Sequence, residues 1–215
     1  LQMTLGRLQL RAGRTADAIP ILERVAAQAP WAAEPLVLLS EAYAASGKLD
    51  DAERALLGAA QINPRYWAQL GQFYERSNKW EDAAGAYDEA IKGMRQPSRD
   101  VQLRLVTALL NVEDGATRAR AVLADLLKSN PNDVRALYLL SSVERADGDL
   151  TAAETAARKI LTADPANVTG LYALVQILFD RYDFKQVVAV VAPFAKDPAS
   201  RAKGREIEGA AVLVQ

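Results

Sequence analysis

Apolar and small residues recur at helical intervals between positions 67 and 90. They form two stripes, and the members of each stripe would lie on one face of a helix. The first stripe consists of Trp67, Leu70, Gly71 and Tyr74, and the second of Ala83, Tyr87 and Ala90. A short polar stretch at residues 76–79 separates them. The pattern therefore predicts two helices that return antiparallel across a tight turn and approach closely at their small residues.

The same pattern recurs along the chain with an almost constant period. The small residue that opens the second stripe can be followed through Ala18, Ala52, Ala83, Ala119, Ala153 and Val187. The successive intervals are 34, 31, 36, 34 and 34 residues. A helix pair of this kind cannot bury its apolar face alone, so the recurrence predicts a stack of such pairs rather than an irregular helical bundle.

This pattern resembles the tetratricopeptide repeat, a helix–turn–helix unit with a 34-residue period. The resemblance covers essentially the whole chain. It implies an all-α fold, an α-α superhelix in which tandem repeats form a solenoid and the first helix of each pair lines the concave face. The pentatricopeptide repeat, an RNA-reading relative of similar period, is the nearest alternative. An RNA-binding pentatricopeptide array should have a basic surface, whereas the formal net charge of this chain is -1.

We expect one array over residues 1–215. Its predicted parts are a partial repeat at 1–30, repeats at 33–64, 65–96, 98–131, 132–165 and 166–198, and a capping helix or the start of a further repeat at 199–215. The sixth repeat departs most from the pattern, because Val175 and Val187 replace small residues and Pro193 lies inside its second helix. We expect its helices to lie further apart or its last turn to break. Because Leu1 already lies inside a repeat, we expect the chain to be a fragment.

The composition removes most catalytic chemistry. The chain has no Cys and no His, which excludes disulfides, thiol or imidazole catalysis and the usual zinc ligands. We find no phosphate-binding glycine loop and no nucleophile elbow in the sequence. Acidic pairs at 50–51, 81–82 and 113–114 each precede a second helix, where carboxylates favour the helix N-terminus. We therefore predict no enzyme activity, no catalytic residue, no cofactor and no metal site.

Charge and hydropathy bear on the partner and the compartment. The near-neutral net charge gives no reason to expect nucleic acid, and no apolar run is long enough to insert directly into a membrane. We expect a soluble protein, although the sequence does not choose between cytoplasm and periplasm. Frequent Ala and Arg without Cys suggest a bacterial source.

The surface of the first helices remains as the candidate for function. On each of them, the stripe displaced by one residue from the core stripe should face the concave side. In the second repeat this stripe is Glu34, Val37, Glu41, Ala44 and Ala45, and in the third it is Ala68, Gln72, Glu75 and Arg76. In the C-terminal half it combines arginines with aromatic residues, which are well suited to anchor a partner. The candidate binding residues are Arg104, Arg135, Tyr138, Arg145, Tyr172, Gln176 and Phe179.

These residues predict a protein or peptide partner that carries acidic and apolar residues. Two other interpretations stay open, namely a solvated face whose arginine stems cover apolar surface, and packing against another part of the same protein. Some tetratricopeptide relatives clamp the acidic tails of heat-shock chaperones with a Lys-Asn pair. The corresponding pairs here are Val37/Glu41, Ala68/Gln72 and Arg104/Ala108. None of them matches, so chaperone-tail binding is not predicted.

The first functional hypothesis is a non-enzymatic interaction module that binds a peptide or protein in its concave face. The alternative is a substrate-orienting repeat region of a larger enzyme, for example a glycosyltransferase or kinase, whose catalytic domain lies outside this sequence. A third hypothesis is self-association through an exposed apolar C-terminal helix that presents Ile207, Ala211 and Val214.

Overall fold

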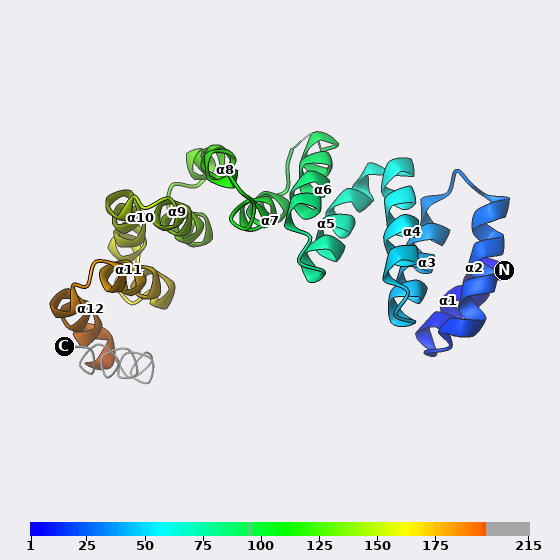
Figure 1. Ribbon diagram of the computed structural model, residues 1–215, viewed down its shortest axis with the longest axis horizontal. Helices are drawn as coiled ribbons and strands as arrows, with labels where there is room; N and C mark the ends of the chain where they lie inside the picture. The colour runs from blue at the N-terminus through cyan, green and yellow to red at the C-terminus, as the bar shows by residue number, and fades with distance from the viewer. Residues whose placement is uncertain (95, 197–215) are drawn as a thin grey trace. The chain divides into compact units, whose positions relative to one another are not determined.

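The computed structural model describes residues 1–94 and 96–196, and the regular structure of these residues is helical throughout (Figure 1). The first helices of successive pairs are α1 (Gln2–Arg11), α3 (Ala33–Ala45), α5 (Trp67–Arg76), α7 (Arg99–Leu109), α9 (Val134–Ala146) and α11 (Val168–Asp180). The second helices are α2 (Thr15–Gln28), α4 (Leu49–Ile62), α6 (Trp80–Lys92), α8 (Gly115–Ser129), α10 (Leu150–Ala163) and α12 (Phe184–Lys196). A 3-10 turn, η1 (Pro64–Tyr66), precedes α5. The all-α fold predicted from the sequence is confirmed.

The chain divides into two compact units. The first comprises Leu1–Ala108, and the second begins at Leu109, the last residue of α7. No helix within residues 1–94 and 96–196 is long and apolar enough to cross a membrane. The residue limits assigned above to the individual repeats stay predictions.

The small-residue position that recurs along the sequence lies in the helix contacts. All six of its members have no exposed surface, and they are Ala18, Ala52, Ala83, Ala119, Ala153 and Val187. Gly71 on α5 shows why such positions stay small. A Cβ atom placed at Gly71 would lie 2.5 Å from a carbon of the Tyr87 ring on α6, and that ring is itself fully buried. The predicted close approach of α5 and α6 is thus confirmed.

The described turns between the helices of a pair share one backbone feature, a residue with a positive φ angle. These residues are Gly13 (73°), Gly47 (76°), Asn78 (54°), Asp114 (56°), Gly148 (85°) and Tyr182 (58°). At residues 43–48 and 74–79 the turn is closed by a backbone bond from the sixth residue to the first, as in a Schellman motif. Tyr182 is the bulky exception in this set, because Gly, Asn and Asp tolerate the left-handed conformation far better.

The turn between α7 and α8 depends on a second kind of glycine. Gly115 opens α8, and its φ angle is not in the left-handed region. A Cβ atom at Gly115 would lie 2.0 Å from the carbonyl oxygen of Leu109 and 2.9 Å from its carbonyl carbon. The chain therefore passes so close to its own backbone that only glycine fits.

The core of the second unit includes α11 and α12. Leu171, Leu174, Ile177 and Leu178 are buried there together with Val187 and Val191. α12 continues through Pro193 to Lys196, so a break of its last turn, one of the two expected outcomes, is wrong, whereas the other, a wider separation of the two helices, stays a prediction. Pro193 is exposed, and its missing N–H removes only one bond near the described end of the helix. Residues 197–215 lie outside the described part of the chain, and so do the predicted C-terminal helix and its apolar residues Ile207, Ala211 and Val214.

Candidate functional site

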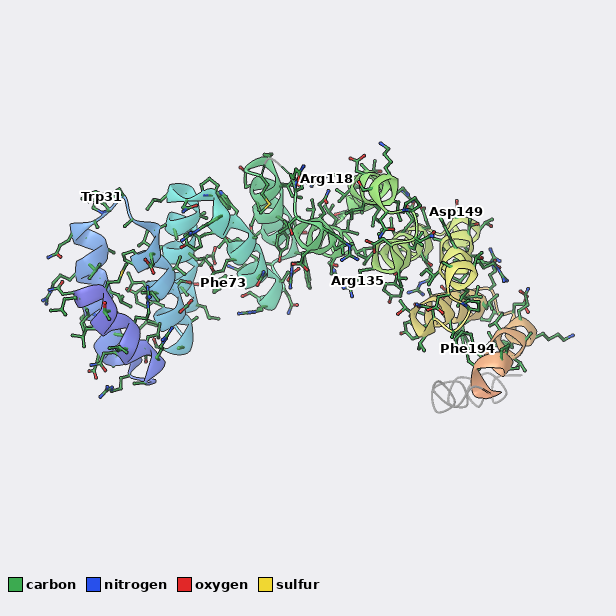
Figure 2. The ribbon with its side chains drawn as sticks, turned by 180° about the vertical axis from the view of Figure 1, so that it is seen from behind. Trp31, Phe73, Arg118, Arg135, Asp149 and Phe194 are labelled. Carbon is green, nitrogen blue, oxygen red and sulfur yellow. The ribbon has the colours of Figure 1, made fainter. Side chains whose placement is uncertain are left out.

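The first unit contains a pocket of about 460 Å³ formed largely by the first helices α3 and α5. Its most buried lining residues are Ser40 and Leu56, which are 4% and 2% exposed. The remaining lining residues are Glu41, Ala44, Gln69, Gln72, Phe73 and Arg76 (Phe73 is labelled in Figure 2). The pocket thus combines two primary amides, which both donate and accept hydrogen bonds, with one carboxylate, one guanidinium and one phenyl ring. The pocket therefore presents hydrogen-bond donors, hydrogen-bond acceptors and one apolar ring side by side.

The displaced stripe identified from the sequence contributes part of this pocket. Glu41, Ala44, Gln72 and Arg76 belong to that stripe, but none of them was among the seven candidate residues. Gln69 and Phe73 lie outside the stripe and were missed. The stripe rule thus placed four of the lining residues, but the choice of arginines and aromatic residues in the C-terminal half as candidates left the pocket unpredicted.

Carboxylates of the second helices hold the following first helices in place. The Tyr43 hydroxyl on α3 donates to Glu23 on α2 at 2.6 Å, and the Tyr74 hydroxyl on α5 donates to Glu53 on α4 at 3.2 Å. Lys79 adds a second bond to Glu53, with 2.6 Å between Nζ and Oε2. Hydrogen bonds from the second helix of one pair to the next pair therefore hold α3 and α5, which form most of the pocket, in position.

We expect tyrosines of the first unit to ionise late. Burial and the hydrogen bond to Glu23 raise the pKa of Tyr43 to about 12. Burial and nearby carboxylates also raise the pKa values of Tyr74 and Tyr87. Because the raised values belong to the folded state, the associated stability is complete below the ordinary tyrosine pKa of about 10 and is lost as the pH rises through the folded values.

Absorbance of tyrosinate checks this expectation. At about pH 11, between the ordinary and the raised pKa values, the native protein should show fewer ionised tyrosines than the same protein in urea, and its free energy of unfolding should be lower than at neutral pH. Phenylalanine at position 43 should reduce the difference in ionisation between the two states. Superimposable native and unfolded titration curves would contradict the raised pKa values.

Arg104, the first of the candidate binding residues, is held within the first unit. Its Nη1 lies 2.9 Å from Oε2 of Glu75 on α5, and its Nε lies 3.1 Å from Oδ2 of Asp100 one turn earlier on α7. The Glu75 side chain is only 16% exposed, so this ion pair is partly sheltered. Arg104 therefore already has two carboxylate partners, and it belongs to a different unit from the other six candidates.

The other six candidates lie on two helices of the second unit that pack directly on each other, α9 and α11. We call this set the α9/α11 face; it consists of Arg135, Tyr138 and Arg145 on α9 and Tyr172, Gln176 and Phe179 on α11. Arg145 Nη1 lies 3.0 Å from Oδ2 of Asp180 on α11 and so joins the two helices. Sequence reasoning thus assembled a set of residues that the fold brings onto neighbouring helices.

The side chains of the α9/α11 face differ in how much they expose. Tyr138 and Phe179 are half-buried against the core of the second unit. Tyr172 is 48% exposed, and Arg135 is exposed near the start of α9 (Arg135 is labelled in Figure 2). The face can therefore offer a partner an aromatic ring and a guanidinium without first unfolding anything.

Other hydrogen bonds fix the start and the end of α9. Buried Asp133 caps the helix by accepting the N–H groups of Arg135 and Ala136 at 3.0 and 3.1 Å. Near the other end, Arg120 of α8 binds both carboxylate oxygens of Glu144, with Nη2 2.8 Å from Oε2, and also binds Asp147. The scaffold below Arg135, Tyr138 and Arg145 is thus fixed from both sides.

A metal site in this chain would need several acidic side chains close together, because the sequence has no His and no Cys. Within residues 1–94 and 96–196, no group of three or more acidic side chains could hold a metal ion. Burial raises the pKa of Glu154, but the hydrogen bonds and charges of Arg158 and Arg181 outweigh it and lower the pKa overall. That carboxylate therefore stays ionised and serves as an ion-pair partner.

The chain is similar in sequence to tetratricopeptide repeat proteins. Three tetratricopeptide repeat models match the chain, at residues 9–73, 67–101 and 103–168. The TPR repeat-containing protein PA4667 of Pseudomonas aeruginosa is 31% identical over 137 residues, which cover 61% of this chain and 23% of that protein. The chain thus spans less than a quarter of the length of this curated relative.

Solved structures share the fold at low sequence identity. A tetratricopeptide repeat protein from Parabacteroides merdae has a TM-score of 0.67 at 15% identity, covering 99% of this chain and 89% of its own. PilW, described as a widely conserved type IV pilus biogenesis factor, has a TM-score of 0.59 at 17% identity and 91% coverage of both chains. YrrB, described as a TPR protein with an unusual peptide-binding site, has a TM-score of 0.59 at 15% identity, covering 90% and 95%. These similarities confirm the predicted class, a helical repeat solenoid.

Proposed function

Because the chain belongs to the tetratricopeptide repeat family and is a protein-interaction repeat scaffold, we propose that it binds an extended segment of a protein partner on the α9/α11 face. The observation that carries this proposal is the packing of α9 on α11, because these two helices carry all six candidate residues of the face. Arginine and tyrosine are over-represented among the residues that dominate binding energy at protein interfaces.

The chemistry of the face favours a partner segment with acidic and apolar residues. Arg135 can pair with a carboxylate through two parallel hydrogen bonds, and the half-exposed ring of Tyr172 offers rigid contact area. Arg145 is already paired with Asp180, so it can exchange or share a carboxylate rather than supply a free charge. The α3/α5 pocket in the first unit is proposed as a second contact region, where Gln69 and Gln72 hydrogen-bond to peptide amides.

A binding measurement tests the proposal. A display library of linear peptides is selected on the wild-type chain, and the best binder is titrated against the double variant Arg135→Ala/Tyr172→Ala. We expect affinity to fall about 30- to 700-fold, since each of the two anchors contributes on the order of 1–2 kcal/mol. Both residues are exposed, so the variant should unfold at the wild-type temperature.

The matched control removes a cation from a second helix of the same unit. Lys159→Ala on exposed α10 surface should leave affinity unchanged within about twofold. Equal losses in the double variant and the control would point to general electrostatic attraction and contradict a specific face. Wild-type affinity in the double variant as well as in the Lys159→Ala control would exclude the α9/α11 face as the site.

The alternative, a substrate-orienting repeat region within a larger enzyme, stays a second proposal. One observation favours it, because the stretch matched in PA4667 makes up only 23% of that protein and so lies within a longer chain. Reading the complete reading frame that encodes this chain is the direct test. A catalytic domain in the same frame would support the alternative, and its absence would rule it out.

A further inference from the structure

An aromatic corner lies at the turn between α11 and α12. It consists of Phe179, Tyr182 and Phe184, whose rings meet edge to face. The ring centroids of Phe179 and Phe184 are 5.6 Å apart, and those of Tyr182 and Phe184 are 6.4 Å apart. Tyr182 is 80% exposed, far more than a tyrosine with a packing role needs to be. Since Phe179 also belongs to the α9/α11 face, the corner continues that face beyond the end of α11.

The backbone at Tyr182 is disfavoured for this residue type. Its φ angle of 58° lies in the left-handed region, where a bulky side chain is rare. At the same place in the other described turns stand residues that tolerate this conformation, namely Gly13, Gly47, Asn78, Asp114 and Gly148. The backbone conformation at Tyr182 therefore costs stability, and the ring that it carries is exposed to solvent. Strained residues of this kind cluster at binding sites, where the strain fixes a side chain in advance.

The charges around the corner are unevenly matched. Glu154 is shared by Arg158, 2.6 Å away at Nε, and by Arg181 in the turn itself. Exposed Lys185 follows at the start of α12. Of the acidic groups nearby, Asp180 is paired with Arg145, and Asp183 accepts the N–H of Gln186 as the cap of α12. The cations thus outnumber the carboxylates, and the surplus is complementary to an acidic partner.

The spacing of the rings indicates the conformation of the partner. Two residues of an extended chain span about 6.6 Å, and their side chains point to the same side. The two ring separations in the corner are close to that distance. Each pair of neighbouring rings therefore suits apolar side chains at alternate positions of an extended segment, whereas the side chains on one helical face recur every three or four residues.

We propose that the aromatic corner binds the end of the partner segment and selects an extended stretch with alternating apolar residues followed or preceded by acidic ones. This inference rests on the proposed function, since it assigns the part of the segment that lies beyond the α9/α11 face. Tyr182 is the specificity-determining residue, and its strained backbone holds the ring ready before the partner arrives.

Fluorescein-labelled synthetic peptides serve as probes. Their apolar part is Leu-Ser-Leu-Ser-Leu, extended by Asp-Asp at either end, and the charge-reversed controls carry Lys-Lys instead. Each peptide is titrated by fluorescence anisotropy against the wild-type chain, Tyr182→Gly, Tyr182→Asn and Tyr172→Ala. Thermal unfolding of each variant is recorded in parallel.

We expect the acidic peptides to bind at least 10-fold more tightly than the Lys-Lys peptides. Tyr182→Gly and Tyr182→Asn should weaken binding about 10-fold and yet raise the unfolding temperature by about 2–4 °C, because they relieve the backbone strain. Loss of binding together with a gain in stability cannot come from misfolding. Equal binding of the acidic and basic peptides, or binding of none of them, would overturn the proposed partner chemistry.

The variants separate this inference from the function on which it rests. If Tyr172→Ala weakens binding and both Tyr182 variants do not, the corner is excluded and the α9/α11 face stands. If the Tyr182 variants weaken binding and Tyr172→Ala does not, the corner is supported as a site and the face is contradicted. Unchanged binding in all three variants overturns both.

Discussion

Replacing Gly115 by alanine should destabilise the second unit by about 3 kcal/mol, at the upper end of what overpacking costs. The atoms that a Cβ would meet at 2.0 and 2.9 Å are the carbonyl oxygen and carbon of Leu109. A backbone carbonyl cannot rotate aside as a side chain can, so the α7–α8 turn must open. We expect this opening to disturb the packing of α8 on α9 and the contact of Arg120 with Glu144.

Hydrogen exchange is the suitable measurement, because the three tryptophans, Trp31, Trp67 and Trp80, all lie in the first unit. The amides of α8 and α9 should lose protection in Gly115→Ala, whereas those of α3 and α4 keep it. Truncating Leu109 to alanine as well should not restore protection, since its carbonyl remains. Full protection of α8 in the single variant would show that the turn is not as tight as described.

Replacing Gly71 by alanine should cost about 1–3 kcal/mol through the same kind of overpacking, now against a side chain. The new methyl group would approach the ring of Tyr87 to 2.5 Å, and burial of that ring leaves it little room. Gly85, on α6 of the same helix pair, is the matched control. A Cβ at Gly85 meets no atom within 4 Å, so alanine there should stabilise the helix by about 0.5–1 kcal/mol.

Urea unfolding followed by tryptophan fluorescence reports on both changes, because Trp67 and Trp80 open α5 and α6. Gly71→Ala should lower the urea concentration at the unfolding midpoint, and Gly85→Ala should raise it. Combining Gly71→Ala with Tyr87→Leu should recover part of the loss, since the clash involves ring atoms, and the double-mutant cycle should show favourable coupling. Additive effects would mean that Gly71 and Tyr87 do not compete for the same space.

Much of the fold could be predicted from the sequence because its signals are local and repeated. A stripe of apolar residues identifies a helix, and a polar stretch of a few residues indicates a tight turn after which the next helix runs antiparallel. Repetition then removes the ambiguity that a single stripe would leave. Ala18, Ala119 and Val187, in the least regular repeats, are as fully buried as Ala83 in the most regular repeat.

The candidate site could be predicted only in part, and Arg104 shows the limit. It lies on the displaced stripe of its helix, like Arg135 and Arg145, and the local sequence shows only one of its two carboxylate partners, Asp100 four residues earlier. The second partner is Glu75, which is 29 residues earlier in the chain and reaches Arg104 only once α5 and α7 are in place. Pro193 shows the opposite error, because a local rule gave as one of two expected outcomes a break that the helix does not have.

The sequence by itself determined the all-α class and the succession of helix pairs, because helical periodicity needs only neighbours along the chain. The tertiary structure decided which charges already have partners, that α3 and α5 enclose a pocket, that Gly115 has no room for a side chain and that Tyr182 is held strained in solvent. These features depend on distances between residues that are brought together only by packing. No spacing along the chain encodes such distances.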